Sequence, residues 1–271
     1  MTTTALPALN NYIAMPAAAT ENFRGNGHVL IPGVLAAAEV AAWRRVISLA
    51  AMRYNTEQRA LADRDTYGKA FLQIMNLWEV DEDVKQFTLA KRFGKIAAQL
   101  LGVDNVRIYH DQALYKEPGG GLTPWHQDQY YWPLNTPETV TMWMPLIDIT
   151  EEMGMLTFAS GSHKAGFVGN IAISDESEST FEAFIKERGY PISRPHSMKA
   201  GDATWHYGWT LHSAPGNAAA VTREVMTIIF MADDAIITAP QNNHQEADRQ
   251  RWLGGLAPGS PAASALNPLV L

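Results

Sequence analysis

The triplet His126-Gln127-Asp128 is the part of the sequence whose residue types and spacing best suit metal chemistry. On an extended strand, side chains two residues apart lie on the same face, roughly 6–7 Å apart along the backbone. An imidazole and a carboxylate placed in this way can converge on one ion, and two histidines with one carboxylate suit non-haem Fe(II). The simpler alternative is a surface hydrogen bond between the two side chains. A metal site needs a further ligand from a distant segment, and both His206 and His212 are candidates.

Arg223 follows His212 by eleven residues and lies in a run that is otherwise rich in β-forming residues. An arginine among such apolar neighbours is costly to bury unless an anion accompanies it. The anion could be a protein carboxylate, in which case the arginine forms a structural salt bridge. It could equally be a bound carboxylate ligand near the metal.

Helical patterns come first along the chain and strand patterns follow. Helices are expected from Leu35 to Ala51 and from Val84 to Leu101, where apolar residues recur at spacings of three and four before Gly102. Strands are then expected at 106–115, 139–149 and 224–232, after a short one at 27–33. This order predicts a mainly β fold with flanking helices, a sandwich or barrel with helices packed on one side.

The composition excludes several classes of protein. The chain has 271 residues and a formal net charge of −7, with no concentrated basic segment, so a nucleic-acid partner is not expected. Cysteine is absent, so any metal must be held by His, Asp or Glu. No apolar stretch approaches the roughly 20 residues that span a bilayer, and the N-terminus has no signal-peptide pattern. We therefore expect a cytoplasmic protein without membrane contact, as a monomer or homodimer.

Several motifs, in order from about Gly27 to Ala232, resemble the phytanoyl-CoA dioxygenase-like (PhyH) family of Fe(II)/2-oxoglutarate-dependent oxygenases. The resemblance implies a double-stranded β-helix core, of the jelly-roll or cupin-like type, and an enzyme that uses Fe(II), 2-oxoglutarate and O2. The motifs that carry it are Tyr115-Lys116-Glu117-Pro118-Gly119, Pro124-Trp125-His126-Gln127-Asp128, Trp143-Met144-Pro145-Leu146-Ile147-Asp148, Gly161-Ser162-His163-Lys164, and Gly201-Asp202 followed by His212, Asn217 and Arg223.

The resemblance also implies roles for individual residues. His126, Asp128 and His212 match the three iron ligands, and His212 is preferred to His206 because of its distances from Gly201 and to Arg223. Arg223 matches the residue that grips the far carboxylate of 2-oxoglutarate. Further contacts to that cosubstrate are implied for Trp143 and Gln112.

Two residues depart from the family pattern. Ala214 and Glu224 occupy places where relatives often carry small hydroxyl residues near the cosubstrate, which puts those contacts in doubt.

Asp128 bears on the type of reaction, because related halogenases have a small residue there that leaves room for chloride. An aspartate ligand therefore favours hydroxylation, desaturation, epoxidation or cyclisation, with release of succinate and CO2.

The substrate is expected to be a small organic molecule such as a natural-product intermediate. Candidate contacts are the polar Gln73 and the aromatic run Tyr130, Tyr131 and Trp132, which directly follows the ligand segment. Ordinary core packing is the alternative for the aromatic residues.

We expect one oxygenase domain over residues 1–271. It would comprise an N-terminal arm (1–26), a catalytic core (27–232) with an insertion at 164–200 that covers the site, and a C-terminal extension (233–271). A helix is expected at Thr180–Glu187, inside the insertion. The alternatives are a cupin-like binding or scaffold protein with a vestigial metal site, and a zinc hydrolase, which leaves Arg223 without a function.

Overall fold

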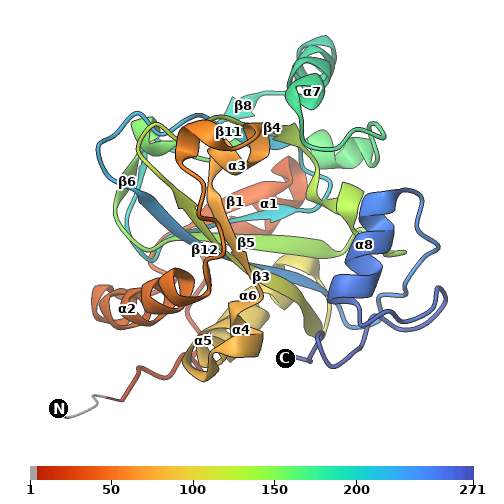
Figure 1. Ribbon diagram of the computed structural model, residues 1–271. Coiled ribbons are helices and arrows are strands. Elements are labelled where there is room, and N and C mark those ends of the chain that lie inside the picture. Colours follow the sequence, from red (N-terminus) through yellow and green to blue (C-terminus); the bar gives the residue numbers. More distant parts are fainter. Residues whose placement is uncertain (1–4) are drawn as a thin grey trace.

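Two antiparallel sheets face each other in the computed structural model, which describes residues 5–271 (Figure 1). The larger sheet has the strand order β1 (His28–Ile31), β10 (Ala203–Tyr207), β5 (Thr139–Pro145), β12 (Arg223–Ala232), β3 (Val106–Lys116) and β2 (Leu72–Met75). The smaller sheet has the order β4 (Thr123–His126), β11 (His212–Ala214), β7 (Thr157–Ala159) and β8 (Ile192–Ser193). A third, two-stranded sheet pairs β6 (Ile149–Thr150) with β9 (Ser197–Met198).

Helices cover the outer face of the larger sheet. The helices of the first half of the chain are α1 (Ala19–Asn26), α2 (Ala37–Tyr54), α3 (Thr66–Ala70), α4 (Leu77–Val80), α5 (Glu82–Thr88) and α6 (Lys91–Leu101). Of these, α2, α4, α5 and α6 lie together on one side of the molecule in Figure 1. Later in the chain come α7 (Asp175–Arg188) and α8 (Asn243–Trp252). The expectation of a mainly β fold with flanking helices is confirmed.

The central strand β12 shows how the two faces of the larger sheet differ. Met226, Ile228 and Phe230 point outward and pack in one apolar cluster with residues of α6 such as Phe93. Because successive side chains of a strand alternate between faces, the residues between them point toward the smaller sheet. This inner face of the larger sheet is where the functional side chains gather.

The prediction of a single helix at 84–101 is wrong, because the chain forms two helices there. Asp81 caps α5 by accepting hydrogen bonds from the backbone N–H groups of Asp83 and Val84. The first helix ends at Thr88, and Ala90 has an extended backbone (φ −65°, ψ 127°) before α6 begins. Phe87 and Phe93 still meet across this break, with ring centroids 5.0 Å apart, so the apolar spacing continues although the helix does not.

The other expected elements are found with different boundaries. The expected strand at 139–149 divides into β5 and the short β6, and the helix expected at 180–187 is part of the longer α7. The N-terminal arm contains α1. Residues 1–4 of this arm lie outside the described part of the chain. The C-terminal extension packs against β3, where the Ile108 N–H donates to Pro268 O and the Val270 N–H donates to Val106 O.

In the part of the chain that the structure describes, no helix is both long enough and apolar enough to cross a membrane.

Candidate functional site

His126, Asp128 and His212 come together where the smaller sheet faces the larger one. The two histidines lie directly opposite each other in the pairing of β4 with β11. Their Nε2 atoms are 3.5 Å (His126) and 3.6 Å (His212) from Asp128 Oδ1. One potential ligand atom from each residue lies within 4.8 Å of the other two, and within residues 5–271 this is the only such group of three metal-binding side chains.

The local backbone geometry explains why the side chains of His126 and Asp128 lie on the same face. His126 ends β4, Gln127 keeps an extended backbone, and Asp128 begins the short 3-10 helix Asp128–Tyr131. The two-residue spacing on extended backbone therefore places the imidazole and the carboxylate on one face, as predicted.

Backbone carbonyl groups orient both imidazoles. His126 Nδ1 lies 2.7 Å from Pro124 O, and His212 Nδ1 lies 2.9 Å from Thr210 O. Since a carbonyl oxygen only accepts, each Nδ1 carries the proton and each Nε2 presents a lone pair. Burial, with His126 close by, also holds the pKa of His212 well below its usual value, so the ring is neutral. A neutral imidazole with a free Nε2 is the form that binds a metal ion.

Asp128 connects the two sheets through its second oxygen. Oδ2 accepts a hydrogen bond from Thr141 Oγ1 at 3.0 Å and lies 3.3 Å from His206 Nε2. Burial opposes ionisation of Asp128, but the surrounding histidines outweigh it and hold its pKa well below the usual value. The residue is therefore a carboxylate, with Oδ2 held by the larger sheet and Oδ1 directed at the two histidines.

The structure separates the two histidine candidates. His212 completes the group of three, whereas His206 lies beside it, with ring centroids 4.4 Å apart, and contacts Asp128 from behind. The preference for His212 therefore agrees with the geometry, and His206 supports the carboxylate.

A cavity of about 390 Å³ runs along the inner face of the larger sheet, past the group of three. Among the sequence candidates, it brings together Gln73, Gln112, Tyr131, Trp132, Trp143 and Arg223 with His126, Asp128 and His212. Tyr130 is not among the lining residues; its ring packs edge-on against Tyr131 at 4.9 Å. Gln73 Nε2 donates to Gln112 Oε1 at 3.0 Å, so these two candidates form a pair.

Arg223 lies at one end of this cavity and is only 2% exposed. Its Nη1 donates to Gly154 O, its guanidinium lies 5.2 Å from the Trp143 ring, and its Nε has no hydrogen-bond partner among the described residues. Burial lowers its pKa to about 9. In residues 5–271 no carboxylate forms an ion pair with it, so the salt-bridge alternative finds no support. An anionic ligand would strongly stabilise a buried cation of this kind.

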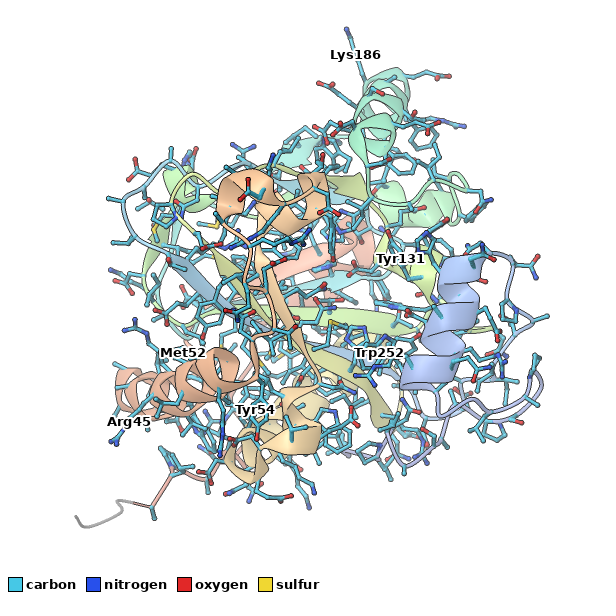
Figure 2. All side chains as sticks on the ribbon, in the orientation of Figure 1. Arg45, Met52, Tyr54, Tyr131, Lys186 and Trp252 are labelled. Carbon is cyan, nitrogen blue, oxygen red and sulfur yellow. The ribbon has the colours of Figure 1, made fainter. Side chains whose placement is uncertain are left out.

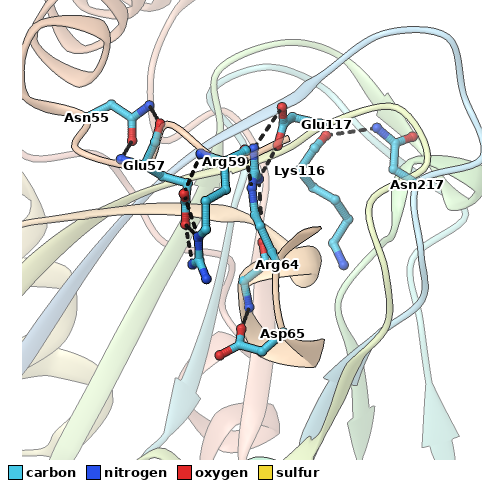
Figure 3. A network of polar contacts seen from close by, with 9 residues as sticks. Asn55, Glu57, Arg59, Arg64, Asp65, Lys116, Glu117 and Asn217 are labelled. Carbon is cyan, nitrogen blue, oxygen red and sulfur yellow. Dashed lines mark hydrogen bonds and ion pairs between the residues drawn. The ribbon is translucent and has the colours of Figure 1, made fainter. Parts of the chain in front are cut away.

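Lys116, which lies in one of the family motifs but was not predicted as a site residue, is a second buried basic side chain at this end. It lies opposite Arg223 in the pairing of β3 with β12, and its Nζ donates to Gly121 O at 2.5 Å. Burial, together with the charge of Arg223, lowers its pKa to about 6. Figure 3 shows how the surrounding loops hold this end of β3: Asn217 Nδ2 donates to Lys116 O, and Arg64 pairs with Glu117.

The two departures from the family pattern have different outcomes. Ala214 lines the cavity and offers no polar group there. Glu224 points to the outer face, where it pairs with Arg44 at 2.6 Å and accepts a hydrogen bond from Ser48. The hydroxyl-bearing residues Thr123 and Thr227 line the cavity instead.

The insertion at 164–200 contacts the site from the side of the smaller sheet. Ala172 and Ile173 line the cavity, and the Ile173 N–H donates to the Tyr131 hydroxyl at 2.9 Å. Glu178 of α7 accepts a hydrogen bond from the Trp125 N–H at 2.7 Å, next to His126. Through these contacts the insertion packs against the cavity and against β4.

Sequence reasoning also missed His110, Thr141 and Asp248, which line the cavity. Thr141 lies in the predicted strand at 139–149, two residues before Trp143, so its position facing the cavity was inferable from alternation. No sequence signal marks Asp248, which lies on α8 far along the chain from the ligand motifs.

Several known proteins resemble this chain in sequence or in fold. A probable alpha-ketoglutarate-dependent hypophosphite dioxygenase of Stutzerimonas stutzeri is 25% identical over 139 residues, which cover 49% of this chain and 47% of the relative. The chain spans about half the length of the curated relatives it matches.

Two solved structures share the fold over nearly the whole chain. The non-heme alpha-ketoglutarate-dependent carbocyclase SnoK from nogalamycin biosynthesis has a TM-score of 0.78 at 24% identity, covering 99% of this chain and all of SnoK. The epimerase SnoN, solved with Fe3+, alpha-ketoglutarate and nogalamycin RO, has a TM-score of 0.75 at 23% identity, covering 93% of this chain and 97% of SnoN. The jelly-roll core implied by the motifs is thereby confirmed.

The family profile described as phytanoyl-CoA dioxygenase (PhyH) matches residues 23–225, three quarters of the chain. The predicted resemblance is confirmed: the chain belongs to the phytanoyl-CoA dioxygenase (PhyH) family of Fe(II)/2-oxoglutarate-dependent oxygenases.

Proposed function

We propose that the protein is an Fe(II)- and 2-oxoglutarate-dependent dioxygenase that oxidises a small organic molecule, with succinate and CO2 as co-products. The observation that carries the proposal is Arg223, a buried guanidinium without an ionic partner in the described chain, at the end of the cavity that holds His126, Asp128 and His212. A metal site alone fits several activities. A metal site that shares its cavity with an anion-binding end fits a chelating dicarboxylate.

The donor set fits ferrous iron. Two neutral imidazoles and one carboxylate leave a divalent ion with a net charge of +1 and with open positions. Because His126 and His212 are each held by a backbone carbonyl and Asp128 by Thr141, the three donors are oriented before any ion binds. Bound iron, with 2-oxoglutarate and O2, supplies the oxidising chemistry.

The remaining residues bind and orient the organic ligands. Arg223 would donate charge-assisted hydrogen bonds to the far carboxylate of 2-oxoglutarate, with Lys116 close by, and Trp143 and Gln112 would flank the cosubstrate. Gln73, Tyr131 and Trp132 would contact the substrate, while Tyr130 supports the ring of Tyr131. Ala172 and Ile173 of the insertion limit the access of water. All of these parts would act as one oxygenase domain.

The type of oxidation is proposed from Asp128. With this carboxylate in place, the chain has the full set of three protein ligands, which favours hydroxylation, desaturation, epoxidation or cyclisation over halogenation. Two proteins with the same fold are a carbocyclase and an epimerase from nogalamycin biosynthesis, which supports a natural-product intermediate as the substrate.

The first test is an anaerobic titration with Fe(II) and 2-oxoglutarate, which should produce a weak visible charge-transfer band. A vestigial site would give none. With O2 and a true substrate added, succinate should form; His126→Ala and Asp128→Ala should abolish its formation while the protein stays folded. His196→Ala is the matched control, because His196 is an almost fully exposed histidine outside the cavity. Succinate formation by the doubly substituted variant at the wild-type rate would refute the proposal.

A further inference from the structure

The end of the cavity away from Arg223 carries a second polar site. Arg223, Thr227 and Ile229 of β12 all line the cavity, and the first and the last are six residue steps apart, which is roughly 20 Å of strand. At the far end, α8 contributes His244, Asp248 and Trp252 to the lining. Figure 2 labels Trp252, the last residue of this helix, and Tyr131, whose ring lies 5.3 Å from that of His244.

A β-bulge in β3 builds this end. The register of β3 against β12 shifts between the pairs Ile229↔His110 and Phe230↔Ile108, so Tyr109 is the extra residue. Two consecutive side chains therefore turn away from the outer helices: His110 lines the cavity, and Tyr109 packs with Trp252 in the apolar cluster beneath α8. A bulge next to an active site commonly redirects a side chain in this way.

Asp248 is held by one hydrogen bond, and no lysine, arginine or histidine of the described residues forms an ion pair with it. Its Oδ2 accepts a hydrogen bond from the Tyr109 hydroxyl at 3.0 Å, and within residues 5–271 no other side chain bonds to it. Burial raises its pKa to about 7. Arg223, at the opposite end, is the only lysine or arginine among the described residues that line the cavity.

The side chains of His110, Tyr131 and Trp252, which line this end of the cavity with Asp248, are aromatic. His110 is 3% exposed, its Nδ1 has no hydrogen-bond partner among the described residues, and burial lowers its pKa to about 3. The rings of Tyr131 and Trp252 line the same part of the cavity. Arg251 lies 4.8 Å from the Trp252 ring but does not line the cavity. A carboxylate among aromatic faces is the combination that attracts an organic ammonium group, by ion pairing and by cation–π contact.

We propose that Asp248, with the aromatic rings around it, binds a protonated amine on the substrate. The proposal rests on the proposed function, since it assigns the substrate class of that same cavity. The amine would lie at the α8 end and the carbon to be oxidised near His126, Asp128 and His212. Tyr67 and Tyr131 line the same cavity as Asp128 and Asp248.

The experiment compares amines with alcohols of the same shape: tryptamine with tryptophol, and 1-adamantanamine with 1-adamantanol. Each is titrated by anaerobic calorimetry into protein loaded with Fe(II) and 2-oxoglutarate at pH 8, where Asp248 is ionised and the amines are protonated. Asp248→Asn removes the charge and keeps an oxygen that accepts from Tyr109. Glu246→Gln is the matched control, because Glu246 lies on the same helix, outside the cavity lining, and pairs with Arg249.

In the wild-type protein and the Glu246→Gln control, at least one amine should bind at least tenfold more tightly than its alcohol. The preference should fall below threefold in Asp248→Asn. Equal affinities for amine and alcohol, no binding of any amine, or a preference that survives Asp248→Asn would each overturn the proposal. A failure of the proposed function appears separately, as the absence of the charge-transfer band in wild-type protein, and the amine titration can then be repeated without metal.

Discussion

Replacing Arg223 by methionine tests the proposed cosubstrate site most directly. Methionine keeps an unbranched apolar chain in a position that is 2% exposed, but it removes the guanidinium. The far carboxylate of 2-oxoglutarate would then be buried without its main partner. Breaking a buried ion pair by removing one partner costs about 3–5 kcal/mol. At about 1.4 kcal/mol per factor of ten, the dissociation constant should rise about 100- to 4,000-fold.

Lys116 should reduce the loss of 2-oxoglutarate affinity that Arg223→Met causes. With Arg223 gone, the pKa of Lys116 should rise, because the charge of Arg223 is one of the two causes that lower it. A protonated Lys116 would then compensate in part. The double variant Lys116→Met/Arg223→Met should therefore lose more affinity than Arg223→Met alone.

The assay is an anaerobic titration of the Fe(II)-loaded protein, followed by the charge-transfer band, with 2-oxoglutarate and with 2-oxopentanoate. The second ligand has the same keto-acid group and lacks the far carboxylate. Arg223→Met should abolish most of the preference for 2-oxoglutarate and leave the affinity for 2-oxopentanoate within threefold of wild type. Arg45→Met, at an exposed arginine of α2 labelled in Figure 2, is the control. If Arg223→Met binds 2-oxoglutarate like wild type, or loses both ligands equally, the reasoning is refuted.

Four further outcomes are expected. His206→Ala should weaken Fe(II) binding about 10- to 100-fold in a competition titration, because His206 holds Asp128 Oδ2, and His206→Gln should restore part of it. Asp128→Asn should weaken Fe(II) binding further than His206→Ala does, since it alters a direct ligand; equal effects would contradict the assigned roles. Between pH 6 and 10 the unfolded chain holds a proton on Lys116 that the folded protein lacks. The free energy of unfolding should therefore rise with pH, by up to about 1.4 kcal/mol per pH unit. Lys116→Met should reduce that slope, as measured by denaturant titrations at several pH values. Phe93→Ala, in the fully buried contact with Phe87, should lower the free energy of unfolding by about 3–5 kcal/mol without changing Fe(II) affinity.

The metal site could be predicted from sequence because its geometry is largely local. His126 and Asp128 share a face through two extended peptide units, and this holds whatever the rest of the fold does. Choosing His212 required the family pattern. His206 and His212 are an even number of residues apart, so alternation alone treats them alike, and only the path of the chain between β10 and β11 separates them.

Predictions from the spacing of apolar residues were wrong in two places. In one, the backbone breaks but the apolar spacing continues; in the other, a bulge interrupts the alternation of a strand. The break at Ala90 is invisible in the spacing of Phe87 and Phe93, because both side chains enter the same apolar cluster. In β3 the opposite occurs: regular alternation places His110 and Ile108 on one face, whereas the bulge at Tyr109 sends them to opposite faces. Asp248 was unpredictable because it reaches the cavity through the packing of α8, which no local pattern encodes.

The position of Arg223 at the inner end of an elongated cavity has a kinetic consequence. The lining residues near Arg223 are almost fully buried, whereas Tyr67 is 36% exposed and His244 is also open to solvent. Molecules would then enter and leave past Tyr67 and α8, so a dicarboxylate must arrive before the substrate fills the passage, and succinate cannot depart until the oxidised product has gone. Steady-state kinetics should therefore show compulsory-order binding, with succinate trapped behind a slowly released product.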